Sequence, residues 1–177
     1  PALLNSLFIQ KYDRKKVEII VSDDGSSDKT GAAVKALMKK HPELKYVYQK
    51  NSGPSAARNN GIRAAKGKII GFIDSDVIAD KNLIKNALKI FKHSKADVIE
   101  GMTLSLERDI KNTVFTHTVQ NKTGKRWITC NLFARREIIE KIGGFDEEFR
   151  HPIREDTALG FAMLKAGAVS DFSEKII

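Results

Sequence analysis

The sequence predicts an α/β fold built around a largely parallel sheet. Short segments rich in β-branched and aromatic residues alternate with longer segments whose apolar residues recur at helical spacing. This alternation is the pattern of βαβ units. The 177 residues are 41% hydrophobic and 30% charged, a balance typical of globular domains and not of disordered chains.

Four short apolar segments are expected to form buried strands, because each is brief and rich in β-branched or aromatic residues. They are Val17–Val21, Tyr46–Tyr48, Lys68–Ile73 and Asp97–Ile99. The pattern fades into an irregular stretch from Ser105 to Lys125 and returns as an extended segment at Trp127–Ala134.

Helices are expected between these strands. Asp28 is predicted to cap a helix with Ala33, Val34, Leu37 and Met38 on its apolar face, and Asp80 a helix with Leu83, Ile84, Ala87, Leu88 and Phe91. Pro54 suits the first position of a helix over Ser55–Lys66, which Gly67 would end. Two further helices are predicted at Arg136–Ile142 and at Glu155–Ala166, the latter with Leu159, Ala162 and Met163 turned inward.

The chain is predicted to be a single domain over residues 1–177, with no repeat or interdomain linker. It opens on an amphipathic helix, whereas a βαβ sheet normally begins with a strand, so we expect an N-terminally truncated fragment. No apolar run approaches the roughly 20 residues of a membrane helix. The single Cys130 cannot form an internal disulfide, which favours a cytoplasmic location.

Lysine and arginine number 31 against 22 acidic residues, for a net charge of +9 at pH 7. Such an excess favours anionic partners and allows a peripheral contact with the inner face of the membrane. The lysines are spread over many helices without interleaved aromatic residues, which argues against a nucleic-acid partner. Solvated helix faces explain most of the excess.

Polar residues gather after three of the predicted strands, at Ser22–Asp28, Lys50–Asn59 and Asp74–Asp76. Ligands of open α/β sheets bind beyond the carboxyl ends of the strands, so these clusters are expected to line one site.

Asp74 and Asp76 follow a buried strand and can both reach one divalent cation. The plainer alternative is a turn in which both aspartates bind backbone amides. Two unit charges about 4 Å apart repel by about 4 kcal/mol at an effective dielectric of 20, a repulsion that a bound cation would reverse.

The other polar residues also allow two interpretations. Asp23 and Asp24 offer acceptors for a nucleoside but also suit a capped turn, and Arg58 could hold a phosphate or form a surface ion pair. Glu155 and Asp156 open the last helix, where acids are favoured by the helix dipole and where an aspartate could act as a general base.

These residues together resemble glycosyltransferase family 2, an inverting family with the Rossmann-like GT-A fold. The family's DDGSxD motif corresponds to Asp23–Asp28, and its GxxxARNxGIxxAxGxxIxFxDxD motif to Gly53–Asp76. Its GGFDE and ED motifs correspond to Gly143–Glu147 and to the pair Glu155 and Asp156. The ordered set covers the chain from Val21 to Asp156.

The resemblance implies roles for these residues. Asp23 and Asp24 would hold the nucleoside with Arg58 nearby, Asp74 would contact the ribose or a metal-bound water, and Asp76 would bind Mn²⁺ or Mg²⁺. Asp156 would deprotonate an acceptor hydroxyl that attacks the anomeric carbon in one inverting displacement. Glu155, Gly143 and Gly144 would shape the acceptor side.

The resemblance also has departures. The first strand of the family, with its Pro-Thr-Tyr-Asn-like end, has no counterpart, which leaves activity of this fragment open. Lys125–Trp127 lacks the glutamine of the QxxRW signature of processive polymerases and precedes the ED pair, so that assignment is rejected.

Three rival functions stay open at this point. They are a non-catalytic sugar-nucleotide-binding module, a receiver-type phosphotransfer domain and a haloacid-dehalogenase-type phosphatase that would use Asp74 as its nucleophile. For a glycosyltransferase the resemblance makes UDP-sugars the commonest donors, without excluding GDP or dTDP sugars. The acceptor would be a saccharide, a lipid-linked saccharide or a protein.

Overall fold

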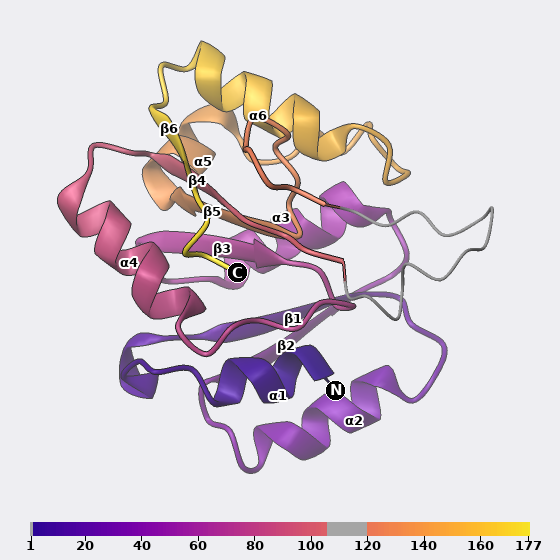
Figure 1. Ribbon diagram of the computed structural model, residues 1–177. Coiled ribbons are helices and arrows are strands. Elements are labelled where there is room, and N and C mark those ends of the chain that lie inside the picture. The colour runs from indigo at the N-terminus through magenta and orange to yellow at the C-terminus, as the bar shows by residue number, and fades with distance from the viewer. Residues whose placement is uncertain (1, 106–119) are drawn as a thin grey trace. The chain divides into compact units, whose positions relative to one another are not determined.

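The computed structural model describes residues 2–105 and 120–177 (Figure 1). Helices and strands alternate along the chain, and the residues form two compact units. The first unit comprises Pro1–Lys11, Gly71–Ala134 and Ala168–Ile177, and the second comprises Tyr12–Ile70 and Arg135–Gly167. The predicted α/β class is confirmed.

The second unit contains a parallel pair of strands, β1 (Ile19–Asp24) and β2 (Leu44–Gln49). Ile19 lies opposite Leu44 and Asp24 opposite Gln49, so the polar ends of both strands meet at one edge. Both predicted strands are confirmed, each extended toward that edge.

The helix between these strands, α2 (Thr30–Met38), follows the short 3₁₀ turn η1 (Arg14–Lys16) and β1 in the chain. Asp28 lies just before it and accepts a hydrogen bond from the Thr30 amide at 2.9 Å. Lys29, not Asp28, is the residue at the cap position, so the predicted cap is displaced by one residue.

Helix α3 (Pro54–Ala64) begins with Pro54, as predicted, but ends two residues before Lys66. Glu18 accepts hydrogen bonds from the amides of Lys66 and Gly67, which therefore leave the helical pattern. Gly53 precedes the helix with a φ of 97°, and a Cβ there would lie 2.6 Å from the Arg150 carbonyl oxygen. Only glycine fits this position.

Two helices complete the second unit, α5 (Arg136–Ile142) and α6 (Glu155–Lys165). They pack against each other, and the Lys141 ammonium donates to the Ala166 carbonyl at 2.7 Å. Leu159 and Met163 of α6 are buried as predicted, whereas Ala162 is half-buried.

A four-stranded sheet in the order β3-β5-β4-β6 belongs mostly to the first unit. The strands are β3 (Ile69–Ile73), β5 (Asn131–Arg135), β4 (Val98–Gly101) and β6 (Ser170–Ser173). β4 pairs with β6 in parallel and with β5 in antiparallel orientation. β6 was not expected, because Ser170–Ser173 carries polar residues on an exposed edge.

Helix α4 (Leu83–His93) and the short helix α1 (Ala2–Phe8) also belong to the first unit. Leu83, Ala87 and Phe91 of α4 are buried, in agreement with the predicted face. Asp80 is not the cap: the cap position is Asn82, whose amide donates to Asp80 Oδ1 at 2.8 Å. The Gln10 side chain supplies an acceptor for the Ile84 amide at 3.0 Å.

The predicted irregular stretch Ser105–Lys125 lies mostly outside the described residues. At its described end, Asn121 pairs with Thr103. The buried Glu100 carboxylate accepts hydrogen bonds from the amides of Lys125, Arg126 and Trp127. Trp127 consequently has a left-handed φ of 57°, so the extended segment starts at Asn131 and not at Trp127.

Within residues 2–105 and 120–177, no helix is long and apolar enough to cross a membrane.

Candidate active site

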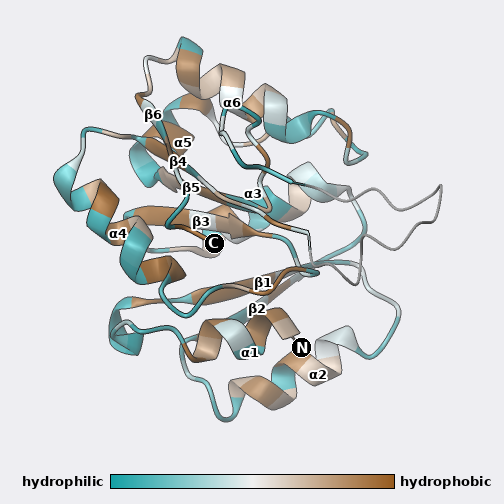
Figure 2. Cartoon of the chain, viewed as in Figure 1, coloured by the Kyte–Doolittle hydropathy of each residue, from teal (hydrophilic) through white to brown (hydrophobic). Residues whose placement is uncertain are grey.

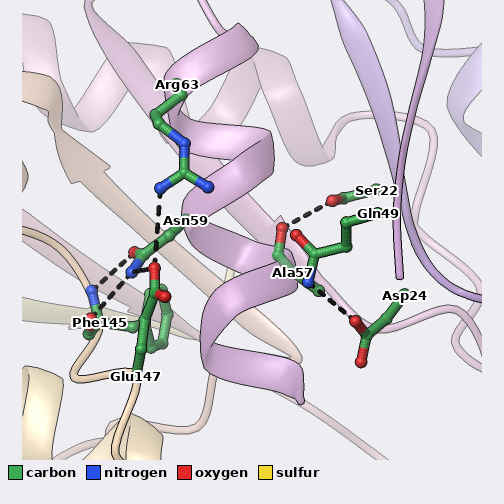
Figure 3. A network of polar contacts seen from close by, with 8 residues as sticks. All are labelled: Ser22, Asp24, Gln49, Ala57, Asn59, Arg63, Phe145 and Glu147. Atoms are coloured by element: carbon green, nitrogen blue, oxygen red, sulfur yellow. Dashed lines mark hydrogen bonds and ion pairs between the residues drawn. The ribbon is translucent and has the colours of Figure 1, made fainter. Parts of the chain in front are cut away.

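Asp24 ends β1 and holds the loop that leads into α3. Its Oδ1 accepts a hydrogen bond from Gln49 Nε2 at 2.8 Å (Figure 3). Oδ1 also accepts one from the Ser52 amide at 2.8 Å, and Oδ2 accepts one from the Gly53 amide at 2.9 Å. Ser22 Oγ, on the same strand, donates to the Ala57 carbonyl at 2.6 Å. The end of β1 and the first turn of α3 are thereby fixed to each other.

Asp23 lies beside Asp24 but is buried, with 4% of its surface exposed. Tyr46 Oη donates to its Oδ2 at 2.5 Å and the Ser26 amide to its Oδ1 at 2.8 Å. The hydrogen bond from Tyr46 lowers the pKa of Asp23, outweighing the opposite effect of burial. The same bond raises the pKa of Tyr46 to about 12. Asp23 is therefore ionised and Tyr46 neutral at physiological pH.

Asn59, in the second turn of α3, holds the GGFDE turn through three hydrogen bonds. Its Nδ2 donates to the Phe145 carbonyl at 2.9 Å and to Glu147 Oε1 at 2.8 Å, and its Oδ1 accepts from the Phe145 amide at 2.8 Å (Figure 3). Asn59 has no individual role among the residues predicted from the sequence, although it lies inside the GxxxARN motif, which is the signal that marks it.

Gly143 and Gly144 make the sharp turn that brings Phe145 to Asn59. Both have left-handed backbones, with φ values of 82° and 84°. A Cβ on Gly144 would lie 2.5 Å from Asn59 Oδ1, whereas one on Gly143 would meet nothing within 4 Å. The two glycines therefore shape this turn for different reasons, one of backbone conformation alone and one also of space.

Arg58 contacts Glu155 and so joins α3 to the start of α6. Its Nη1 lies 2.7 Å from Glu155 Oε1, and the guanidinium lies 5.4 Å from the centre of the Phe145 ring. Only 21% of the Arg58 side chain and 5% of the Glu155 side chain are exposed. In this structure the guanidinium is engaged by a carboxylate of the protein.

Asp156 follows Glu155 in the first turn of α6, where the positive end of the helix dipole stabilises a carboxylate. It is half-buried, and its Oδ1 accepts a hydrogen bond from the Thr157 amide at 2.8 Å. The Arg58–Glu155 contact thus fixes the backbone that carries Asp156.

Asp74 and Asp76 belong to the first unit, directly after β3. Asp76 is exposed and Asp74 half-buried. Among the residues that the structure describes, no group of three or more histidine, cysteine, aspartate or glutamate side chains could by itself hold a metal ion. Asp24, Arg58, Glu155, Gly143 and Gly144 therefore all make their contacts within the second unit. Asp74 and Asp76 belong to the first unit.

A model of the family described as "Glycosyl transferase family 2" matches residues 1–148. An uncharacterized glycosyltransferase of Rickettsia conorii is 35% identical over 123 residues, and glycosyltransferase GlyG of Streptococcus pneumoniae is 34% identical over 114 residues. These matches cover 70% and 64% of this chain but only 17% and 38% of the relatives, so the chain spans less than half of their length.

Solved structures resemble this chain in fold. TarS of S. aureus superposes over 98% of this chain and 32% of its own, with a TM-score of 0.78 and 23% identity. The mannosyltransferase PcManGT of Pyrobaculum calidifontis, in complex with GDP-Man and Mn²⁺, covers 98% of this chain and 50% of its own, with a TM-score of 0.75 and 22% identity. With the family match over residues 1–148, these findings establish that the chain belongs to glycosyltransferase family 2 and has the GT-A fold.

Proposed function

We propose that this chain transfers a sugar, with inversion, from a nucleoside-diphosphate sugar to an acceptor hydroxyl. The observation that carries the proposal is the meeting of three motif segments at the start of α3. Asp24 binds the Gly53 amide before α3, and Arg58 within α3 binds Glu155 at the start of α6. Family membership displaces the receiver-type and phosphatase alternatives, and residues 1–148 of the family match include residues of both units, which supports one catalytic domain.

The carboxylate oxygens at the end of β1 can accept hydrogen bonds from a nucleoside only where a lone pair is not already used by the protein. A carboxylate oxygen can accept two hydrogen bonds. Within residues 2–105 and 120–177, Asp24 Oδ1 accepts two hydrogen bonds and Oδ2 accepts one, which leaves one lone pair on Oδ2. Asp24 Oδ2 is thus our proposed acceptor for a ribose or base N–H or O–H group, with the buried Asp23 holding the strand end in place. Arg58 borders the same site.

For the metal, the donor set fits a hard divalent cation. Mg²⁺ is usually held by one or two carboxylates together with substrate phosphates and water, not by a cage of protein groups. Asp74 and Asp76 are separated by one residue and supply two such carboxylates, Asp76 exposed and Asp74 half-buried. The described residues offer no group of three or more possible ligands. We propose that Asp76, assisted by Asp74, holds Mn²⁺ or Mg²⁺, which would neutralise charge on the departing diphosphate.

For the chemistry, Asp156 is the proposed general base. Its carboxylate would take the proton of the acceptor hydroxyl while the oxygen forms a bond to the anomeric carbon and the nucleoside diphosphate departs with the electron pair of the broken C–O bond. Glu155, Gly143 and Gly144 would shape the acceptor side, which takes a saccharide, a lipid-linked saccharide or a protein.

UDP-sugars are the first donors to test, since TarS is solved with UDP. We place the reaction in the cytoplasm, which is supported by the single Cys130 of the sequence, since it forms no disulfide.

The test is calorimetric titration of UDP, GDP and dTDP, first with Mn²⁺ and then with EDTA. The wild type is compared with Asp76→Ala and with Asp171→Ala, a control aspartate that is exposed in the same unit. Binding of one nucleotide that needs both metal and Asp76, and survives in the control, is expected. Equal binding by Asp76→Ala would contradict the metal assignment. Metal-dependent binding without any turnover of the matching nucleotide sugar would favour a non-catalytic module.

A further inference from the structure

Helix α4 carries an unusual concentration of lysine. Residues 81–96 contain five lysines and neither aspartate nor glutamate. The lysines are exposed, whereas Leu83, Ala87 and Phe91 are buried on the opposite face. Figure 2 shows the resulting alternation of hydrophilic and hydrophobic residues along α4. The helix therefore presents a basic surface that is continuous along its length.

Three of these lysines form one row. Lys85, Lys89 and Lys92 are spaced by four and three residues, which places them above one another on the helix surface. Among the described residues none of them forms an ion pair. Acids flank the helix only at its ends, where Asp80 accepts from the Asn82 amide and Asp97 from the Val169 amide. The row, with Lys81 and Lys95 at either end, is the lysine face.

Helix stability does not account for the whole lysine face. Cations near a helix C-terminus are favoured by the dipole, which explains Lys92. Lys81 and Lys85 lie at the N-terminal end of α4, where the dipole disfavours cations. Repulsion between neighbouring lysines adds to this cost. Positive charge at that end requires another explanation.

Exposed apolar side chains lie near the same end of α4. The Lys11 amide donates to the Lys81 carbonyl at 2.8 Å, and Gln10 Nε2 donates to the Asp80 carbonyl at 2.6 Å. Ile9, the residue before Gln10, is 66% exposed, and Ile78 is 56% exposed. Exposed isoleucines near one end of a row of lysines favour contact with a lipid bilayer, where lysines meet anionic headgroups and apolar side chains can enter the interface.

We propose that the lysine face of α4 docks on an anionic lipid bilayer surface. Nucleic acid is the less suitable occupant, because α4 carries no arginine and its one aromatic residue, Phe91, is buried. The lysines form a row on a convex helix surface, which suits a flat layer of charged headgroups better than a strand held in a groove. The proposal goes beyond sugar transfer and does not depend on the donor site.

The experiment is co-sedimentation of the chain with vesicles of phosphatidylcholine, with and without phosphatidylglycerol. The test variant is Lys85→Glu/Lys89→Glu/Lys92→Glu. The control, Lys16→Glu/Lys40→Glu/Lys68→Glu, changes the net charge equally at exposed lysines of the second unit. Far-UV circular dichroism checks that both variants are folded, and UDP calorimetry reports the donor site separately.

Wild type and control are expected to bind vesicles that contain phosphatidylglycerol, and to release them in high salt, because exposed charges are screened. Each lysine near an anionic surface strengthens binding about fivefold, so the α4 variant should lose on the order of 100-fold or more in partitioning. Equal loss in the control, equal binding to neutral vesicles, or retained binding by the α4 variant would overturn the proposal. Displacement of the chain from these vesicles by a short single-stranded oligonucleotide, added at the same total charge as the phosphatidylglycerol, would assign the lysine face to nucleic acid instead.

Discussion

Arg58 and Glu155 are separated by 97 positions in the chain, yet their side chains form an ion pair at 2.7 Å. The pair is almost fully removed from solvent at its glutamate end, which is 5% exposed. A buried carboxylate of this kind depends on its partner, since charge without a partner is costly in a medium of low dielectric.

Removal of Arg58 is therefore expected to destabilise the fold. Arg58→Ala leaves the Glu155 carboxylate buried without this partner, and a loss of about 3–5 kcal/mol in the free energy of unfolding is expected. Arg63→Ala is the matched control, because its contact with Glu147 at 3.6 Å is more than half exposed on both sides and should contribute less than about 1 kcal/mol. Urea unfolding measures both. Equal effects of the two substitutions would show that the Arg58 pair is not protected from solvent.

Asn59 should be far more sensitive to substitution than its neighbour on α3. Asn59→Ala removes three hydrogen bonds and leaves the Phe145 amide without its acceptor, which should cost about 1–3 kcal/mol. Asn60→Ala is the control, because the Asn60 side chain is half-buried and makes no such contact with the GGFDE turn. Similar unfolding midpoints for the two variants would contradict the role given to Asn59.

The two adjacent glycines should differ in their response to alanine. Gly143→Ala should cost about 1–2 kcal/mol, the strain of a left-handed backbone with a Cβ. Gly144→Ala should cost roughly a further 1–3 kcal/mol, because its Cβ would displace Asn59 Oδ1 and overpack the turn. Thermal or urea unfolding of the two variants gives the difference. A smaller effect at Gly144 than at Gly143 would argue against the contact with Asn59.

The Asp23–Tyr46 hydrogen bond predicts a dependence of stability on pH at both extremes. The folded-state pKa of Asp23 is lowered, so its contribution is present above the ordinary carboxyl pKa and is lost as pH falls through the lowered value. The pKa of Tyr46 is raised to about 12, so its contribution is complete below the ordinary value of 10.0 and is lost as pH rises toward 12.

Tyr46→Phe should flatten both limbs of the pH profile, while Tyr48→Phe on the same strand, 59% exposed, should leave them unchanged. Urea midpoints across the pH range of each limb provide the measurement. Identical profiles for Tyr46→Phe and the wild type would rule out the hydrogen bond as their cause.

Asp156→Asn should slow turnover strongly without weakening donor binding. Loss of a general base typically lowers the rate by roughly 10²–10⁴-fold. Asparagine keeps the size of the aspartate side chain. The release of UDP by hydrolysis of UDP-sugars measures turnover without a known acceptor, and calorimetry measures donor binding. Asp171→Asn serves as the exposed control. Turnover by Asp156→Asn near the wild-type rate would remove Asp156 from the proposed mechanism.

Local pattern was sufficient for most of the elements. The strands around Ile19, Tyr46, Ile70 and Val98 and the helices of both units lie where β-branched runs and helical periodicity place them. The errors came where a distant partner intervened. Glu100 binds the amides of residues 125–127, so that Trp127 is left-handed and not extended. Ser170–Ser173 forms a strand because β4 offers it a partner, not because its own sequence is apolar.

The site divides in the same way. The motif residues could be named from the sequence because it resembles glycosyltransferase family 2 at these positions: Asp23, Asp24, Arg58, Gly143, Gly144, Glu155 and Asp156. Their actual partners could not, since Tyr46, Gln49 and Asn59 gain their roles only through contacts made after folding.

By itself, then, the amino-acid sequence determined the α/β class, the order of the elements and the family, because periodicity and motif order are properties of neighbouring residues. Tertiary structure alone decided that Arg58 binds Glu155 and that Asn59 holds Phe145. Such contacts join residues as many as 97 positions apart, and their energies depend on burial, which no local pattern records.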